Sequence, residues 1–288
     1  MSSSLVWLIT GTSSGLGRDF AVAALNRGDK VIATARGRSI AKLEELKAQG
    51  ADVLELDVTA PLPDLKAIAD KAIAIHGKVD VVVNNAGYVD FGSIEERTPE
   101  ESVAQFNTNV FGALNVTRAF LPHLRERKSG SVVFIGSMAG WSGGAGLGLY
   151  TASKHAIRAL ADSLAGEVAP FGIKVLNIEP GYFRTALLQP GARSEYEARI
   201  PVYQPIMGPI NDFLQAASGK QAGDPVKAAQ LLVELVHGDG AAKGKELPVT
   251  IGLGTDYHEY VKAFADDTLK RLADWEEVTK STDFPKGT

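Results

Sequence analysis

The chain has 288 residues and a formal net charge of −4, with 45% hydrophobic and 22% charged residues. This is the composition of an ordinary globular protein, and the length is enough for one large α/β domain. The acidic balance disfavours nucleic acid as the main partner, because phosphate binding requires a basic face. The absence of cysteine excludes disulfides, thiolate catalysis and cysteine-based metal sites. It also suits a reducing compartment, so we expect a cytoplasmic protein.

Neither a membrane span nor a signal peptide is expected. No stretch approaches the roughly 18 uninterrupted apolar residues that a spanning helix requires. The N-terminus runs into a short apolar strand without a preceding basic region.

Apolar runs alternate with helical patterns along most of the chain, which predicts strands joined by helices. This alternation predicts a three-layer, doubly wound parallel sheet of the Rossmann type, with about seven strands in a single domain over residues 1–288. The expected strands are residues 5–9, 30–36, 52–56, 79–83, 131–135, 173–178 and 247–251. The expected helices between and after them include residues 39–49, 61–76, 100–127, 150–169 and 225–237.

Two segments depart from this alternation. Residues 182–222 contain four prolines and scattered aromatic residues, which predicts a small substrate lid of short helices. The tail, residues 256–280, is amphipathic, and we expect it to pack onto the domain. Docking of the tail to a partner chain is the alternative.

A glycine-rich turn follows the first strand and opens the first helix. The spacing is G-x-x-x-G-x-G, and it suits a pyrophosphate, because glycines allow close approach and a helix N-terminus attracts negative charge. A simple turn before a helix is the alternative. The residues expected to contact the cofactor here are Gly11, Ser13, Ser14, Gly15, Leu16 and Gly17.

The second strand ends at Arg36, where an NAD site would be expected to carry an acidic residue. A cation at this point suits the 2′-phosphate of NADP(H), and Ser14 could add a hydroxyl to the same phosphate. The alternative for Arg36 is a solvated surface arginine. Asp57 and Val58, after the third strand, are candidates for the adenine, whereas a surface helix cap is the alternative for Asp57.

The segment from Ser137 to Lys154 combines a hydroxyl, a phenol and an ammonium group. Ser137 follows a buried strand, and a glycine-rich loop leads to Tyr150 at the start of a helix. Tyr150 and Lys154 are four residues apart, so they lie on the same helix face. We interpret this as the place where a proton moves, and simple packing of the tyrosine is the alternative.

These motifs together resemble the short-chain dehydrogenase/reductase family of the single-domain type. The matching segments appear in the family's order over residues 5–185, and the rest of the chain is not identified in this way. The segments are Thr10-Gly11-x-x-x-Gly15-x-Gly17, Asn84-Asn85-Ala86-Gly87, the tetrad Asn109, Ser137, Tyr150 and Lys154, and Pro180-Gly181 with Thr185. Arg36 with Ser14 resembles NADP-preferring members, including carbonyl reductases and hydroxysteroid-type dehydrogenases.

The resemblance implies hydride transfer between NADP(H) and a ketone or secondary alcohol, with Tyr150 as general acid/base. A cation about 4–5 Å from the phenol oxygen would lower a tyrosine pKa of about 10 by roughly two to three units before any cost of burial. Lys154, together with the positive nicotinamide, would supply this charge, and Lys154 would also bind the nicotinamide ribose. Ser137 would hydrogen-bond the substrate oxygen, and Asn109 would position Lys154 through a water molecule.

The remaining expected contacts line the cofactor groove and the substrate pocket, and we expect a fairly apolar substrate. The cofactor contacts are Asn84, Ala86, Gly87, Tyr150, Lys154, Pro180, Gly181, Phe183 and Thr185. The substrate contacts are Ser137, Trp141, Leu147, Tyr150 and Tyr182.

Two other functions stay open from the sequence. One is a catalytically silent NADP(H)-binding sensor, which the complete tetrad disfavours, and the other is a dehydratase or epimerase. The histidines show no metal-binding spacing, so no metal is expected. The resemblance implies a homodimer or homotetramer formed through helices 100–127 and 150–169.

Overall fold

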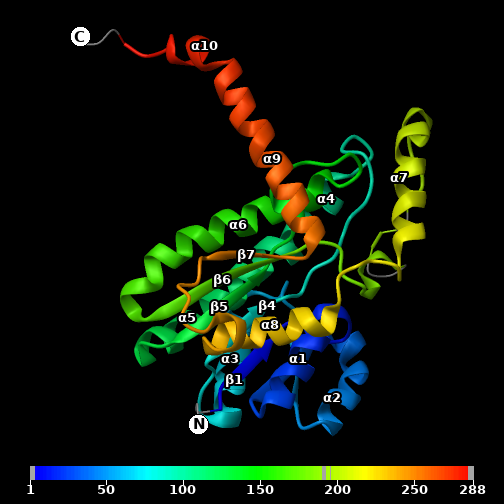
Figure 1. Cartoon of the computed structure of the whole chain (residues 1–288). Coiled ribbons are helices and arrows are strands. Elements are labelled where there is room, and N and C mark those ends of the chain that lie inside the picture. The colour runs from blue at the N-terminus through cyan, green and yellow to red at the C-terminus, as the bar shows by residue number, and fades with distance from the viewer. Residues whose placement is uncertain (1–3, 190–192, 195, 285–288) are drawn as a thin grey trace.

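The computed structural model describes residues 4–189, 193–194 and 196–284. Its centre is a seven-stranded sheet with the strand order β3-β2-β1-β4-β5-β6-β7, and every neighbouring pair is parallel (Figure 1). The predicted doubly wound sheet is therefore confirmed. The strands are β1 (Val6–Ile9), β2 (Lys30–Ala35), β3 (Asp52–Glu55), β4 (Val81–Asn84), β5 (Gly130–Ile135), β6 (Ile173–Pro180) and β7 (Thr250–Leu253).

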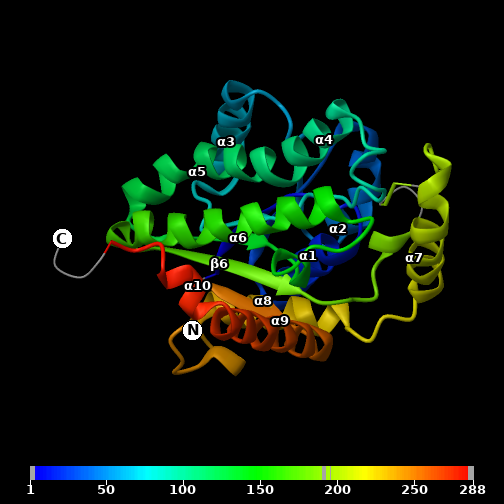
Figure 2. The ribbon, with the colours of Figure 1, turned by 90° about the horizontal axis from the view of Figure 1, so that it is seen from above.

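Helices cover both faces of the sheet, as Figure 2 shows from above. On one face, α1 (Gly15–Arg27) and α8 (Pro225–His237) pack against the strands in one hydrophobic core. On the other face, α3 (Leu62–His76), α5 (Ala113–Arg127) and α6 (Gly148–Val168) form a second core. The central strands are apolar on both sides because both of their faces are buried.

Two predicted helices are less regular than expected. The segment predicted as a helix over 39–49 is a 3₁₀ turn (Gly37–Leu43) followed by the short α2 (Glu44–Ala48). The long helix predicted after Pro99 consists of α4 (Pro99–Phe106), a π-helical segment (Asn107–Gly112) and α5. The π-helical turn carries Asn109, a predicted site residue.

The segment 182–222 contains one substantial helix as well as short turns. Two 3₁₀ turns (Ala186–Leu188 and Pro201–Tyr203) precede α7 (Gln204–Ala217), which has 14 residues and stands beside the main body in Figure 1. Leu214 of α7 packs with Phe91 and Leu188 in a small separate cluster.

The prediction that the tail packs onto the domain is wrong for most of its length. The tail forms α9 (Thr255–Asp274) and α10 (Glu276–Lys280), and Figure 1 shows it extending away from the sheet. Tyr257 is the buried residue of α9, whereas Leu269 and Leu272 are each 65% exposed. Only the beginning of α9 therefore belongs to the packed body.

Candidate active site

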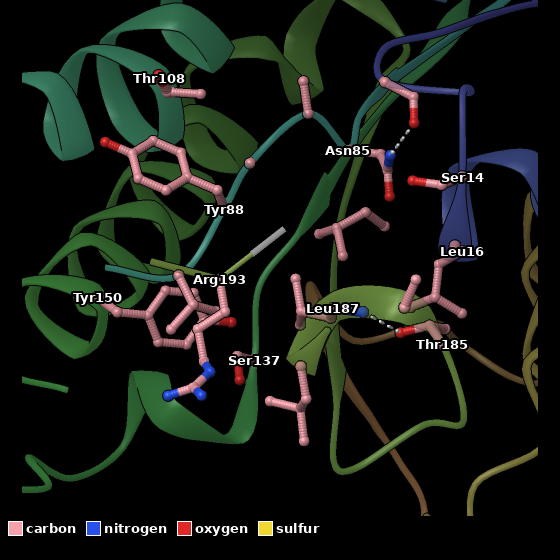
Figure 3. Close-up of a pocket in the computed structure, with 18 of the residues that line it drawn as sticks. Ser14, Leu16, Asn85, Tyr88, Thr108, Ser137, Tyr150, Thr185, Leu187 and Arg193 are labelled. Atoms are coloured by element: carbon pink, nitrogen blue, oxygen red, sulfur yellow. Dashed lines mark hydrogen bonds between the residues drawn. The ribbon is translucent and has the colours of Figure 1, made fainter. Parts of the chain in front are cut away.

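A cavity of about 1250 Å³ lies at the carboxyl ends of the strands. Its walls come from the loops that follow β1 to β6, which is where ligands bind in doubly wound sheets. Figure 3 shows Ser14, Leu16 and Asn85 on one side of this cavity and Tyr88, Ser137 and Tyr150 on the other.

The glycine-rich turn lines the cavity with five of its predicted cofactor contacts, Gly11, Ser13, Ser14, Gly15 and Leu16. Gly15 has a φ of 59°, a left-handed conformation that favours glycine. The first turn of α1 carries no acidic residue, and Ser14 forms no side-chain capping bond there. The first N–H groups of α1 and the Ser14 hydroxyl are thus available to an anion.

Gly17 was predicted to contact the cofactor, but it does not line the cavity. A Cβ atom at this position would lie 2.3 Å from Asn85 Nδ2 and 2.6 Å from the Gly11 carbonyl oxygen. Gly17 is therefore required for the close packing of α1 against the β4 loop.

A basic rim lies at the end of β2, where Arg36, Arg38 and Lys42 all line the cavity together with Ser39. The three basic side chains belong to exposed residues. Sequence reasoning identified only Arg36. Arg38, Ser39 and Lys42 lie in the 3₁₀ turn Gly37–Leu43. Because this turn has a period of about three residues, Ser39 and Lys42 lie on the same face.

Asp57 and Val58, the residues predicted to contact the adenine, line the cavity after β3. One carboxylate oxygen of Asp57 accepts hydrogen bonds from the backbone N–H and the hydroxyl of Thr59, at 2.9 and 2.7 Å. These bonds fix the aspartate at the cavity wall.

Of the predicted β4 motif, Asn84 is the residue that does not line the cavity. Asn84 is buried and donates to the Thr117 hydroxyl at 2.9 Å, so it faces α5 and not the cavity. Asn85, Ala86 and Gly87 line the cavity. The Asn85 amide donates to the Thr10 carbonyl at 2.8 Å and so joins the β4 loop to the glycine-rich turn.

Ser137, Tyr150 and Lys154 all line the cavity. Ser137 begins the 3₁₀ turn Met138–Gly140, and its hydroxyl accepts from the Ala139 N–H at 3.1 Å. Tyr150 lies in the first turn of α6, and the ammonium nitrogen of Lys154 is 5.7 Å from the centre of its ring. Lys154 is buried and donates to the Ile135 carbonyl at 2.7 Å. The spacing along α6 thus brings the three groups together.

Burial changes the pKa values of both Tyr150 and Lys154. Burial raises the pKa of Tyr150 above its ordinary value of 10.0, although a hydrogen bond from the Ser137 hydroxyl acts in the opposite direction. Burial also lowers the pKa of Lys154 to about 8, against an opposing attraction from Glu179. In the cofactor-free chain the cost of burying a phenolate is thus the largest influence on the pKa of Tyr150. A lower Tyr150 pKa with the nicotinamide bound stays a prediction.

Asn109 lies behind Tyr88 and does not line the cavity. Its side-chain oxygen accepts from the Tyr88 N–H at 3.1 Å, and its amide donates to the Tyr88 carbonyl at 3.0 Å and the Ser153 hydroxyl at 3.2 Å. These bonds tie the β4 loop to α6. The water-mediated role of Asn109 toward Lys154 stays a prediction.

All five of the predicted contacts at and after the end of β6 line the cavity. Pro180, Gly181, Tyr182, Phe183 and Thr185 line the cavity, as does Leu147 from the loop before α6.

Trp141 does not reach the cavity, contrary to the prediction. Its indole N–H donates to a carboxylate oxygen of Glu179 at 2.7 Å, and the Arg158 guanidinium lies 3.2 Å from the ring centre. The indole is therefore part of a polar cluster behind the cavity.

Sequence reasoning missed two residues beside Tyr150. Tyr88 lines the cavity, and burial is the main cause of its raised pKa. Arg193 is buried in the cavity wall, donates to the Asn211 side-chain oxygen at 2.9 Å and lies 5.1 Å from the Phe91 ring centre. No motif surrounds Arg193, so only the folding of the 182–222 segment shows its position.

Across the described ranges, no helix has both the length and the apolar character needed to cross a membrane. Within the same ranges, no group of three or more histidine, aspartate or glutamate side chains could hold a metal ion.

Comparison with known proteins identifies the class. Residues 5–195 match the family described as short chain dehydrogenase. Oxidoreductase BOA17 of Botryotinia fuckeliana (strain B05.10) is 34% identical over 281 residues, which cover 95% of this chain and 97% of that protein. The chain therefore belongs to the short-chain dehydrogenase family and is an oxidoreductase of that family.

Two solved structures support this assignment. A short-chain dehydrogenase from Streptomyces avermitilis is 42% identical, with a TM-score of 0.87, over 98% of this chain and 100% of that one. A variant of actinorhodin polyketide ketoreductase, solved with NADPH, is 28% identical with a TM-score of 0.71, over 88% of this chain and 97% of that one.

Proposed function

We propose that the protein is an NADP(H)-dependent oxidoreductase that interconverts a ketone and a secondary alcohol. The observation that carries this proposal is the continuity of one cavity from the basic rim at Arg36, past the glycine-rich turn, to Ser137, Tyr150 and Lys154. A dinucleotide with its phosphates at the turn and its nicotinamide near Tyr150 fits this order of groups. When bound, the cofactor supplies or accepts a hydride at the substrate carbon.

Tyr150, Ser137 and Lys154 transfer the proton and orient the substrate. Tyr150 is a neutral phenol at neutral pH because burial raises its pKa, so it is in the form that donates a proton to a carbonyl oxygen. Ser137 holds the same oxygen by a hydrogen bond. Lys154 is mainly protonated at neutral pH with a pKa of about 8, and it provides the positive charge that stabilises the phenolate after transfer.

The basic rim supports NADP(H) over NAD(H). Arg36, Arg38 and Lys42 line the part of the cavity next to the α1 N-terminus, where a 2′-phosphate would add two negative charges at most. The similarity to a ketoreductase solved with NADPH agrees with this preference.

The substrate end of the cavity supports a mainly apolar substrate with one electronegative group. Leu147, Leu188 and Leu214 line this end, and the lid segment 182–222 supplies the last two. Arg193 adds a cation to the same wall, where it favours a carbonyl or carboxylate beside the reacting carbon.

We also propose a homodimer or homotetramer formed through the α4–α5 region and α6. Val103 of α4 and Phe111 of the π-helical segment are 56% and 49% exposed, which suits a covered position between subunits. Analytical ultracentrifugation measures the state directly, and a monomer would contradict this proposal.

The test of the function is a panel of ketones and alcohols assayed with NADPH and NADP⁺ by absorbance. Turnover of at least one ketone with NADPH, and of the matching alcohol with NADP⁺, is expected. Tight NADPH binding without turnover on any member of a broad panel would contradict the proposal and support the silent sensor.

A further inference from the structure

The clearest unexplained feature outside the reacting groups is the buried carboxylate of Glu179 at the end of β6. The residue has 0% exposure. One of its oxygens accepts from the Asn177 amide at 2.8 Å, and the other accepts from the Trp141 indole at 2.7 Å and the Tyr257 hydroxyl at 2.9 Å. Three neutral donors thus stabilise a buried negative charge, which without them would be very costly.

This carboxylate packs against the turn that carries Ser137. A Cβ atom at Gly136 would be 2.9 Å from Glu179 Cγ, and one at Gly140 would be 3.6 Å from a Glu179 carboxylate oxygen. The same atom at Gly140 would be 3.2 Å from the Lys154 carbonyl oxygen. The glycines on both sides of Ser137 therefore let Glu179 pack against the Ser137 turn and the α6 backbone at Lys154.

Glu179 also acts on the charge of Lys154. Burial lowers the pKa of Lys154, and Glu179 is the group that acts in the opposite direction by favouring the ammonium form. Arg158 also approaches Glu179, at 3.9 Å, but its side chain is 27% exposed. The other ionisable groups around the cluster are Tyr150, Tyr182, Asp256 and Tyr257.

The beginning of α9 completes this arrangement. Burial and Glu179 raise the pKa of Tyr257 to about 12, so its hydroxyl remains a donor throughout the working pH range. The preceding residue, Asp256, accepts from the backbone N–H of Tyr182 in the cavity wall at 2.6 Å. Phe264, two turns further along, packs edge-on against Trp141 at 6.1 Å between ring centres.

We propose that Glu179, held by Tyr257 and Trp141, is a positioning residue for Lys154 and the Ser137 turn. The first turns of α9, which lie outside the segment 5–195 that matches the family, are then part of the catalytic framework. This inference rests on the proposed function, because it assigns Glu179 and Tyr257 a role in the same proton transfer.

The first test is Glu179→Gln, which keeps the shape and removes the charge. Loss of the charge lowers the pKa of Lys154, so the alkaline limb of kcat/KM for ketone reduction should move down by about one pH unit. In the cofactor-free protein, acylation of Lys154 by a small amine-reactive reagent, followed by peptide mass spectrometry, should also begin at lower pH. This second readout does not depend on turnover.

The second test is Tyr257→Phe, which removes one hydroxyl, with Tyr260→Phe as the matched control on the same helix. Tyr257→Phe should lower kcat by about 3- to 10-fold, which corresponds to the usual net contribution of one hydrogen bond, with the dissociation constant of NADPH unchanged. Tyr260 is 36% exposed and does not line the cavity, so Tyr260→Phe should retain the wild-type kcat.

The outcomes separate this inference from the proposed function. If the wild-type protein reduces a ketone while both variants keep its kcat, its pH profile and its Lys154 reactivity, the positioning role is wrong. Lower thermal stability with those three readouts unchanged would likewise show a purely structural cluster. If the wild-type protein turns over no substrate, the proposed function fails, and unchanged Lys154 reactivity in Glu179→Gln would still overturn the inference.

Discussion

Replacing Arg36 with aspartate should change which cofactor the protein prefers. Arg36 is exposed at the end of β2 and lines the cavity with Arg38 and Lys42. In the proposed complex it binds the 2′-phosphate that NADPH has and NADH lacks. The substitution therefore removes an attraction and adds a repulsion for NADPH only.

The expected size of the effect follows from these two contributions. The lost charge-assisted hydrogen bond contributes about 1.5 kcal/mol, the lower end of the usual range, because Arg36 is exposed to solvent. An aspartate about 6 Å from the phosphate repels each negative charge by about 0.7 kcal/mol in water. Together these amount to about 3 kcal/mol, or about a 100-fold fall in kcat/KM for NADPH.

The assay compares kcat/KM for NADPH and NADH at one ketone concentration, with cofactor dissociation constants from fluorescence as a second readout. The matched control is Lys71→Asp, which makes the same change of charge on α3, at an exposed residue that does not line the cavity. Arg36→Asp should lower the NADPH/NADH ratio by about 100-fold, and the control should leave it within about twofold. An unchanged ratio in Arg36→Asp would show that Arg36 faces solvent and would refute the assignment.

Three further results are expected. The kcat/KM for ketone reduction should fall as the pH rises through about 8, because Lys154 loses its proton there, and a flat profile to pH 10 would contradict this. Gly17→Ala should lower the free energy of unfolding in urea by about 1–3 kcal/mol, because the added Cβ would overlap Asn85. Gly166→Ala is the control: an added Cβ there would meet no atom within 4 Å, so this variant should not be destabilised. Arg199→Ala should speed proteolysis within residues 182–222, because Arg199 joins this segment to Glu101 at 2.5 and 2.7 Å, and an unchanged rate would show that other contacts hold the segment.

The sheet and the reacting side chains could be predicted because their signals are local. Apolar runs between helical patterns indicate a parallel sheet whichever residues fill the cores. The interval of four residues between Tyr150 and Lys154 places both on one side of α6 without further information.

Residues at the ends of strands were harder to assign. Successive side chains point to opposite faces of a strand, so only one of Asn84 and Asn85 can face the cavity. Asn84 instead donates to Thr117, and this contact depends on α5, which is 29 or more residues further along the chain. The position of Trp141 also depends on a distant residue, because its indole N–H donates to Glu179 of β6.

The ionisation of Tyr150 could not be predicted from spacing, because it depends on how much protein surrounds the phenol. A nearby cation favours the phenolate, but the cost of burial is the largest influence on the pKa of Tyr150 in the folded chain. The position of Arg193 in the cavity wall could not be predicted, because it depends on the distant pairing of Arg193 with Val89 and no local pattern indicates this pairing.

The tail shows the limit of amphipathic patterns. Its apolar residues predicted packing onto the domain, yet Leu269, Leu272 and Trp275 are at least 60% exposed. Only the first half of α9 reaches the body, where Tyr257 binds Glu179 and Phe264 packs against Trp141. A hydrophobic stripe indicates that a helix face is suited to burial but does not identify what covers it.

The most direct test of the central claim, that Tyr150 transfers the proton, is the turnover of Tyr150→Phe. The substitution removes one hydroxyl and keeps the ring, so NADPH binding and the urea unfolding midpoint should remain those of the wild-type protein. The kcat for ketone reduction should fall by about 10²- to 10⁴-fold, the usual contribution of a general acid. Wild-type turnover in the folded, NADPH-binding variant would contradict the account.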